Sequence, residues 1–540
     1  MPAFPPGLGT LGAAAYNDLH RSASDLDARE ASWTCRPGSS AIPFERWRAS
    51  LTTAQRSSRK TCRMATLMTR RARTKIVATV GPACDGVDRL VRLIEAGVSV
   101  FRINTAHGTS AERDRRLAEI REAEGRVGQP VGVLVDLAGP KIRLGELFAD
   151  PTVCELGQEF RLVTGERSSR PDELTVNYPH LVDDLVVGDT LMLADGMVSL
   201  VVVARQPGEV RCRVTSAGTI RSRQGINVPR ARINVASLTE ADMVNAIWAA
   251  RSGADFVSLS FVRKAVDVLL LKELLRSQGS GALAIAKIEK PEAVEQLGEV
   301  VAAADGVMVA RGDLGVEMDV AEIAVVQKRI VQECQRQGKP VIVATQMLES
   351  MHHNRRPTRA EATDVANAIL DGADACMLSG ETAIGEFPVE TVEMMNRIML
   401  ATEPLLKERG LSPDVQAHDV HPITAAAVRG SALIADQLGA RLVVVATRSG
   451  GTCRLRSKQR DFIPTIGVSD SVSVLRKLSL FWGVTPLAGA PVHDGPKLRA
   501  FIDHWGREQG IIQKGDRLVF VTGTNFYPMA QNVLVIHEAE

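Results

Sequence analysis

Two short apolar runs of the chain end abruptly in charged residues. LAIAKIE (283–289) supplies Lys287 and Glu289, and VMVARGDLG (307–315) supplies Asp313. Lys287 and Glu289 are two positions apart, so on a strand their side chains point to the same face. An ammonium group beside two carboxylates suggests a divalent metal and an anionic substrate. These residues must be positioned by a fold that brings strand ends together.

Composition narrows the classes of protein that need to be considered. At 540 residues the chain should hold more than one domain. A formal net charge of +2 and an aromatic content of 4% argue against a nucleic-acid partner or a charged membrane surface. The eight cysteines form no CxxC pair, which predicts reduced thiols and a cytoplasmic protein. No apolar run is long enough for a membrane helix.

Residues 1–70 differ from the rest of the chain. They are rich in Arg, Ser, Ala and Pro and show no clear periodicity. The apolar core of a secretory signal is missing, and acidic residues argue against an organelle transit peptide. We interpret this segment as a disordered extension, with Met64 or Met68 as a plausible start of the translated protein.

From Thr74 onward, short β-rich apolar runs alternate with amphipathic stretches. The runs are residues 74–81, 98–104, 131–139, 256–262, 283–289, 306–313, 340–346 and 375–381. Apolar strands that alternate with helices predict a parallel sheet covered by helices. Eight such units predict an α/β fold built on a (β/α)8 TIM barrel.

Two further regions complete the predicted architecture. Residues 145–232 contain short alternating runs separated by Gly, Pro and Asp turns, which predicts an all-β lid domain inserted after the third strand. The barrel would then span residues 71–144 and 233–405. Residues 406–540 return to alternating helices and strands, which predicts a C-terminal α/β domain.

Active sites of such barrels lie at the C-terminal ends of the strands. The residues there are Thr79, Pro82, Arg102, Asn104, His107, Asp136, Lys141, Arg143, Lys287, Glu289, Arg311, Gly312, Asp313, Thr345, Ser379 and Glu381. Any one of them could belong to a buried ion-pair network. Burying charged residues from so many strands at one rim costs free energy, however, which favours a functional role for them. Cations mixed with carboxylates suit phosphoryl transfer, and Glu289 with Asp313 suits Mg²⁺.

The motifs of the chain resemble those of the pyruvate kinase family over about residues 72–540. They are KIVATVGPA, RINTAHG, AKIEKPEAV, GVMVARGDLGVE, GKPVIVATQMLESM and RPTRAEATDVANAILDGADACMLSGETAIGEFP, in the order of the family. The resemblance implies transfer of a phosphoryl group from phosphoenolpyruvate to ADP, a mobile β lid and a homotetramer. A barrel lyase or aldolase acting on pyruvate, and a catalytically silent paralogue that senses metabolites, remain as alternatives.

The resemblance also implies roles for individual residues. The residues expected to contact phosphoenolpyruvate are Arg102, Lys287, Gly312, Asp313 and Thr345. Glu289 and Asp313 would hold Mg²⁺ (Mn²⁺ being a possible substitute), and Thr345, Ser379 and Glu381 would position the proton source for the enol. The residues expected to face the nucleotide are Thr79, Pro82, Asn104, His107 and Arg143, and Asp195 would be the contribution of the lid.

One departure from the family pattern concerns a monovalent cation. The family has Ser at the position of Ala106, and its third-strand motif reads Asp-Thr-Lys-Gly-Pro-Glu where this chain has Asp136, Leu137, Ala138, Gly139, Pro140 and Lys141. Two hydroxyls of a K⁺ site are lost and an ammonium is gained. We therefore predict that Lys141 replaces K⁺ and that K⁺ is not required. A Lys141 side chain that points to solvent is the alternative. A nucleotide-side lysine of the family is also changed, to Gln224 with Arg223 adjacent.

A turn in the C-terminal region has the composition of a phosphate-binding loop. RLVVVATRSGGTCRLRSK predicts a strand, a turn rich in hydroxyls and glycine, and a helix. The resemblance implies an allosteric phosphorylated effector at Thr447, Ser449, Gly450, Gly451 and Thr452. An unoccupied βα turn is the alternative.

Overall fold

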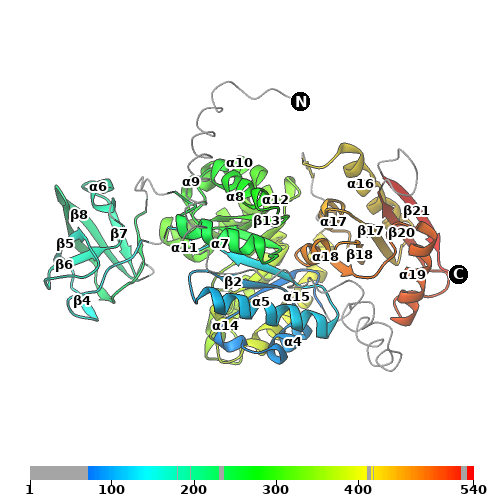
Figure 1. Cartoon of the computed structure of the whole chain (residues 1–540), viewed down its shortest axis with the longest axis horizontal. Coiled ribbons are helices and arrows are strands. Elements are labelled where there is room, and N and C mark those ends of the chain that lie inside the picture. The colour runs from blue at the N-terminus through cyan, green and yellow to red at the C-terminus, as the bar shows by residue number, and fades with distance from the viewer. Residues whose placement is uncertain are drawn as a thin grey trace, which may run out of the picture. The chain divides into compact units, whose positions relative to one another are not determined.

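A computed structural model describes residues 71–140, 142–178, 180–194, 196–229, 236–409, 415–416, 419–523 and 532–540. The predicted extension 1–70, Lys141 and Asp195 therefore lie outside the described residues. Figure 1 colours the chain from its N-terminus to its C-terminus and labels the elements used below.

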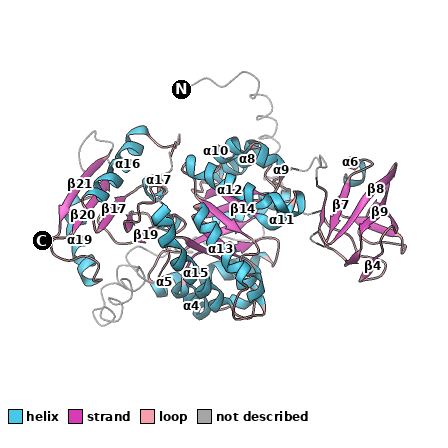
Figure 2. Ribbon diagram, turned by 180° about the vertical axis from the view of Figure 1, so that it is seen from behind, coloured by secondary structure: helices cyan, strands magenta, loops and turns pink. Residues whose placement is uncertain are grey.

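The centre of the fold is a closed barrel of eight parallel strands, in the order β1-β16-β15-β14-β13-β12-β3-β2. The strands are β1 (Lys75–Thr79), β2 (Val98–Asn104), β3 (Gly132–Asp136), β12 (Phe256–Leu259), β13 (Leu283–Ile288), β14 (Gly306–Ala310), β15 (Val341–Ala344) and β16 (Ala375–Leu378). Each one falls inside a predicted apolar run, so the predicted α/β barrel is confirmed. Figure 2 shows these strands with helices around them.

The strands of the barrel are covered by helices. They are α4 (Val87–Ala96), α5 (Ser110–Val127), α7 (Glu240–Arg251), α8 (Ala265–Ser277), α9 (Pro291–Glu295), α10 (Leu297–Ala303), α12 (Val320–Arg336), α13 (Arg359–Asp371) and α15 (Pro388–Arg409). Thr109, Thr239 and Thr358 each form a capping box with an acidic residue three positions later. A capping box satisfies backbone N–H groups that the first turn leaves without partners.

The strand predicted over 306–313 is shorter than expected. β14 ends at Ala310, and α11 (Arg311–Glu317) begins at once. Asp313 consequently lies in the first turn of a helix rather than on a strand. A carboxylate is stabilised there because the helix dipole is positive at its N-terminus.

The predicted all-β insertion is confirmed. It contains a six-stranded sheet, β11-β7-β8-β9-β5-β6, and a two-stranded sheet, β10-β4. Its elements are β4 (Thr152–Cys154), β5 (Glu159–Thr164), β6 (Glu173–Val176), α6 (Leu181–Asp184), β7 (Thr190–Leu193), β8 (Val198–Gln206), β9 (Glu209–Ser216), β10 (Gly218–Ile220) and β11 (Ile226–Asn227). Alternate residues of β8 and β9 are buried, as expected of strands with one face on a core.

The C-terminal region forms a five-stranded sheet in the order β19-β18-β17-β20-β21. Its elements are α16 (Pro422–Gln437), β17 (Leu442–Ala446), α17 (Gly451–Ser457), β18 (Thr465–Val468), α18 (Val472–Leu478), β19 (Val484–Leu487), α19 (Gly495–Glu508), β20 (Arg517–Thr522) and β21 (Val533–Glu538). Only β21 runs antiparallel to its neighbour. The predicted C-terminal α/β fold is therefore confirmed.

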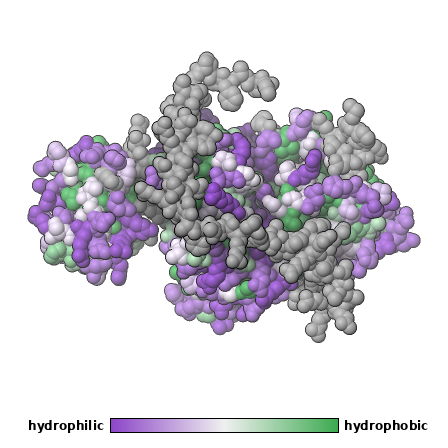
Figure 3. Space-filling model, in the orientation of Figure 1, coloured by the Kyte–Doolittle hydropathy of each residue, from purple (hydrophilic) through white to green (hydrophobic). Residues whose placement is uncertain are grey.

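No helix among the described residues is long and apolar enough to cross a membrane. The described part of the surface drawn in Figure 3 is mostly hydrophilic.

A fully buried ion cluster joins the C-terminal domain to the barrel. Asp374 immediately precedes β16, and its carboxylate pairs with Lys458 at 2.5 Å and Arg460 at 3.0 Å. All three side chains are inaccessible to solvent. The same carboxylate accepts a hydrogen bond of 2.8 Å from the backbone N–H of Val341, which opens β15.

We expect Asp374→Asn to lower the free energy of unfolding by about 3–5 kcal/mol, because it leaves two buried cations without their counter-charge. Denaturant titration followed by circular dichroism measures the change. Asp172→Asn is the matched control, since Asp172 pairs with Arg170 on the surface and such pairs contribute roughly 0–1 kcal/mol. Equal stabilities of the two variants would contradict the assignment.

Candidate active site

Asp136, the last residue of β3, is a buried carboxylate surrounded by donors. Arg102 Nε donates a hydrogen bond to it at 2.8 Å and the Ser258 hydroxyl donates one at 2.6 Å. Burial by itself would raise the pKa of Asp136. The charges of Lys287 and Arg102, with the Ser258 hydrogen bond, outweigh burial and lower that pKa to about 2. Asp136 therefore stays ionised and fixes the orientation of Arg102.

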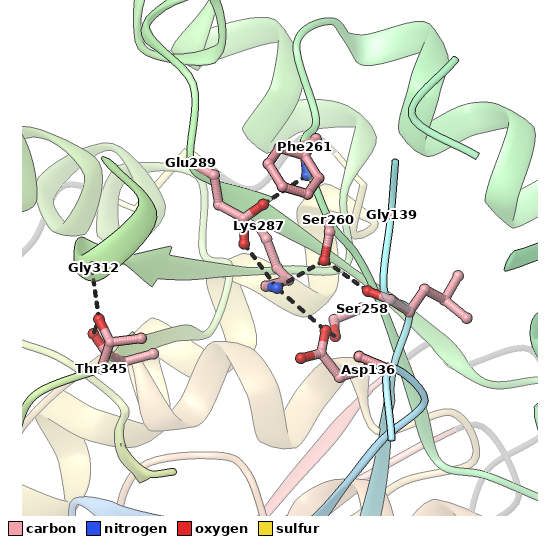
Figure 4. Close-up of polar contacts among 12 residues, drawn as sticks. Asp136, Gly139, Ser258, Ser260, Phe261, Lys287, Glu289, Gly312 and Thr345 are labelled. Carbon is pink, nitrogen blue, oxygen red and sulfur yellow. Dashed lines mark hydrogen bonds and ion pairs between the residues drawn. The ribbon is translucent and has the colours of Figure 1, made fainter. Parts of the chain in front are cut away.

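Lys287 lies at the centre of the group drawn in Figure 4. Its Nζ is 2.7 Å from Glu289 Oε1 and 2.7 Å from Ser260 Oγ, with Asp136 Oδ1 at 3.5 Å. Burial would lower the pKa of Lys287, but the carboxylates of Asp136, Glu289 and Asp313 raise it above its usual value. The site thus holds a permanent positive charge that is almost removed from water.

Glu289 and Asp313 are the two carboxylates predicted to hold a divalent cation. Glu289 follows β13, is almost fully buried and accepts a hydrogen bond of 2.7 Å from the backbone N–H of Phe261. Burial raises the pKa of Glu289, and the neighbouring charge of Asp313 raises it further, although Lys287 opposes both. A divalent cation would relieve the repulsion between the carboxylates, and their hard oxygen atoms are the ligands that Mg²⁺ prefers. The residues present therefore fit the ion.

Thr345 follows β15 in an uncommon backbone conformation. Its φ is 70°, and that of Gln346 is 55°. A β-branched residue in the left-handed region costs about 1–3 kcal/mol and is held there only by its surroundings. The Thr345 hydroxyl donates to Ala344 O at 2.6 Å and accepts from the backbone N–H of Gly312 at 2.8 Å. The hydroxyl is thereby joined to the first turn of α11.

Arg311 supports this turn. Its guanidinium donates to the backbone oxygen of Thr345 at 2.7 Å and pairs with Asp364 at 2.6 Å. Arg311 therefore stabilises the strained turn at Thr345.

Ser379 and Glu381 follow β16, and Glu381 is completely buried. Its carboxylate accepts hydrogen bonds from the backbone N–H groups of Ser379 at 2.7 Å and Leu348 at 3.2 Å. Glu381 thus ties the loop after β16 to the loop after β15.

The predicted nucleotide-side residues fall into two places. The Thr79 hydroxyl accepts from Arg102 at 3.0 Å and donates to Leu378 O at 2.9 Å, so Thr79 joins the central group. The Asn104 side chain accepts from the N–H of Ala106 at 3.0 Å. Arg143 instead pairs with Gly225 in a β-bridge at the base of the insertion and donates to Arg223 O at 3.0 Å.

Pro82 opens the short helix η1 (Pro82–Cys84), and His107 lies in the exposed turn after β2. In the C-terminal domain, the Thr447 hydroxyl accepts a hydrogen bond of 3.0 Å from the N–H of Gly450. Gly451 and Thr452 begin α17.

Sequence reasoning missed the contribution of β12. Ser258 and Ser260 touch the charged pair, and the backbone of Phe261 binds Glu289. The only signal was a pair of serines at alternate positions of the apolar run 256–262.

The lowered pKa of Asp136 leads to a prediction about acid stability. Its unfolded value is near 3.8 and its folded value about 2, so between these pH values the unfolded chain binds more protons. The stability that Asp136 contributes is complete above pH 4 and is lost as the pH falls towards 2, a loss of about 2 kcal/mol. Urea unfolding of wild type and Asp136→Asn from pH 2 to 7 measures it. The stability difference should shrink below pH 4; a difference independent of pH would contradict the prediction.

Comparisons with known proteins agree with the geometry. The family model described as "Pyruvate kinase, barrel domain" matches residues 71–392, and "Pyruvate kinase, alpha/beta domain" matches residues 425–537. A pyruvate kinase from Geobacillus stearothermophilus is 41% identical over 84% of this chain and 77% of its own. One from Corynebacterium glutamicum is 40% identical over 84% and 94%. The crystal structure of a pyruvate kinase from Cryptosporidium parvum superposes with a TM-score of 0.81 at 32% identity, covering 88% of this chain and 97% of that one.

Proposed function

Because the chain belongs to the pyruvate kinase family, we propose that the rim of its barrel transfers the phosphoryl group of phosphoenolpyruvate to ADP and gives pyruvate and ATP. The observation that carries this proposal is the buried ammonium of Lys287, held among three carboxylates at the strand ends. A lyase or aldolase would not need the inserted β domain, and a silent paralogue would not need to keep this charge.

Each residue of the proposed site acts by position and charge. An ammonium has three N–H donors, and Ser260 and Glu289 engage two of those of Lys287 at 2.7 Å. The third N–H has the Asp136 carboxylate nearby at the longer distance of 3.5 Å. It would donate to an oxygen of the migrating phosphoryl group, whose negative charge is best stabilised by fixed donors away from water. Arg102, oriented by Asp136, adds a second positive charge. Gly312, Asp313 and Thr345 complete the contact with phosphoenolpyruvate.

Glu289 and Asp313 would hold Mg²⁺, which supplies positive charge to the phosphoryl oxygens during transfer. The enolpyruvate that remains must be protonated at carbon. Thr345, Ser379 and Glu381 would help to position the source of that proton. Thr79, Pro82, Asn104, His107 and Arg143 face ADP, and Asp195 contributes from the lid.

We expect Lys287→Met to lower kcat by at least about a thousandfold, because it removes the charge that stabilises the phosphoryl group in flight. A coupled assay of pyruvate formation with phosphoenolpyruvate, ADP and Mg²⁺ measures it, and circular dichroism checks the fold. Lys272→Met is the control, since Lys272 pairs with Asp305, the residue before β14 at the opposite end of the strand. Near-wild-type turnover of Lys287→Met would show that the role is assigned wrongly.

The monovalent-cation proposal also rests on the third strand. Leu137 is fully buried in the barrel core and offers no side-chain oxygen, while its backbone oxygen accepts from the Ser260 hydroxyl. Ala106 likewise carries no hydroxyl. The oxygen ligands that a bound K⁺ needs are therefore reduced, and the ammonium of Lys141 supplies the charge instead.

Wild-type activity should change by less than about twofold when K⁺ is exchanged for tetramethylammonium. Lys141→Glu, which restores the residue usual in the family, should lose about tenfold or more without K⁺ because a carboxylate replaces the built-in cation. Initial rates at matched ionic strength measure both effects. Collapse of wild-type activity in tetramethylammonium would rule the idea out.

The proposal also includes an effector site, an oligomeric state and a cellular compartment. A phosphorylated effector would bind at Thr447, Ser449, Gly450, Gly451 and Thr452, where the turn enters α17. The enzyme would act as a homotetramer, in keeping with its family. It would act in the cytoplasm, in keeping with the cysteines of the described residues, which are buried and form no disulfide.

A further inference from the structure

His352 contacts the turn that carries Ser379 and Glu381, two of the residues proposed to position the proton. It ends the short helix η2 (Glu349–His352), and its imidazole lies on the backbone of Gly380, between Ser379 and Glu381. A β-carbon at position 380 would overlap Cε1 and Nε2 of the ring. The glycine is therefore required by the ring, and the ring is fixed against the turn that carries Ser379 and Glu381.

The imidazole of His352 lies near a buried acid, Glu381, and an exposed one, Glu349. Its Nε2 is buried and has no hydrogen-bond partner among the described residues. That nitrogen is 3.6 Å from Oε1 of Glu349, a side chain that is 57% exposed. One ligand atom from each of Glu349, His352 and Glu381 lies within 4.8 Å of the others. A single water molecule can bridge two polar atoms that are separated by 4.8 Å.

From this juxtaposition we propose that His352 is a positioning and relay residue that returns protons from solvent to Glu381 during protonation of the enol. The inference rests on the proposed function and deepens it. Burial raises the pKa of Glu381, so the group is suited to hold a proton between turnovers. Because Glu381 is inaccessible to solvent, it needs a route for reprotonation.

The step balances as a proton transfer. The carbon of enolpyruvate gains a proton from the Glu381 side of the site, directly or through the Ser379 hydroxyl, and the C–H bond forms as the O–H bond breaks. The Glu381 carboxylate then takes a proton from the imidazolium of His352, which is recharged from water beside Glu349. Histidine suits this exchange because its ring nitrogens can both accept and donate a proton.

The charged groups around the ring are few among the described residues. Glu349 lies on the same helix and Glu381 on α14 (Gly380–Ala383). The neighbouring ring of His353 is 6.1 Å away between centroids and pairs with Glu386 at 3.0 Å on the exposed side. His353 therefore provides a matched control, being adjacent in sequence but paired away from Glu381.

The test measures the reverse of the carbon protonation, which is the removal of a methyl proton from pyruvate. An enzyme that protonates the enol must also remove methyl protons from pyruvate, so deuterium uptake from D₂O into pyruvate, with ATP and Mg²⁺, reports the step by ¹H NMR. We expect His352→Gln to lower this exchange by about tenfold and to flatten its pH profile, while His353→Gln changes it by less than about twofold. The KM for phosphoenolpyruvate should stay unchanged in both variants, which a collapsed site would not allow.

Equal exchange rates in His352→Gln and wild type would overturn the inference. So would an increase of wild-type exchange on addition of a chelator selective for transition metals, because these three groups would then be holding a metal. Failure of wild type to form ATP from phosphoenolpyruvate would instead contradict the proposed function. If His352→Gln folds poorly, Glu349→Gln, which removes the exposed end of the route, should lower the exchange in the same direction.

Discussion

The central constraint of this structure is that each charged group buried at the barrel rim lies beside a group of opposite charge. Lys287, Asp136 and Glu289 are each almost fully removed from solvent. Burying any one of them alone would cost several kcal/mol, which the protein avoids because each lies against an opposite charge and at least one further hydrogen bond. The ammonium keeps its proton and Asp136 stays ionised for the same reason. The site is therefore ready to meet an anion without first rearranging its charges.

The closed order of the strands makes this arrangement possible. β12 lies between β3 and β13 in the barrel, so serines at its end are adjacent both to Asp136 and to Lys287. Each serine hydroxyl makes a short hydrogen bond with the charged group beside it: Ser258 donates to Asp136, and Ser260 accepts from Lys287. Small hydroxyl side chains at these positions leave room for the long side chains that meet above them.

This arrangement also explains how far the sequence alone could lead. The eight strands were predictable because apolar runs between amphipathic stretches are a local signal, and charged residues at their ends mark the rim. Ser258 and Ser260 were not, because a serine in an apolar run shows no chemistry until the neighbouring strands are known. The helical start at Arg311 was missed for a related reason: the run continues in sequence, and only the contacts of Arg311 with Thr345 and Asp364 favour the helix.

The two ends of β16 show how the site depends on structure far from it. Asp374, just before the strand, is fixed by buried cations of the C-terminal domain, and Ser379 and Glu381 follow its other end. This strand of four residues pairs with β1 on one side and with β15 on the other, so its place in the barrel is fixed by both neighbours. A shift of Lys458 or Arg460 would move the strand that carries the buried acid. Both cations follow α17, the helix that begins at Gly451, so the position of the buried acid depends on this segment of the C-terminal domain as well as on the barrel.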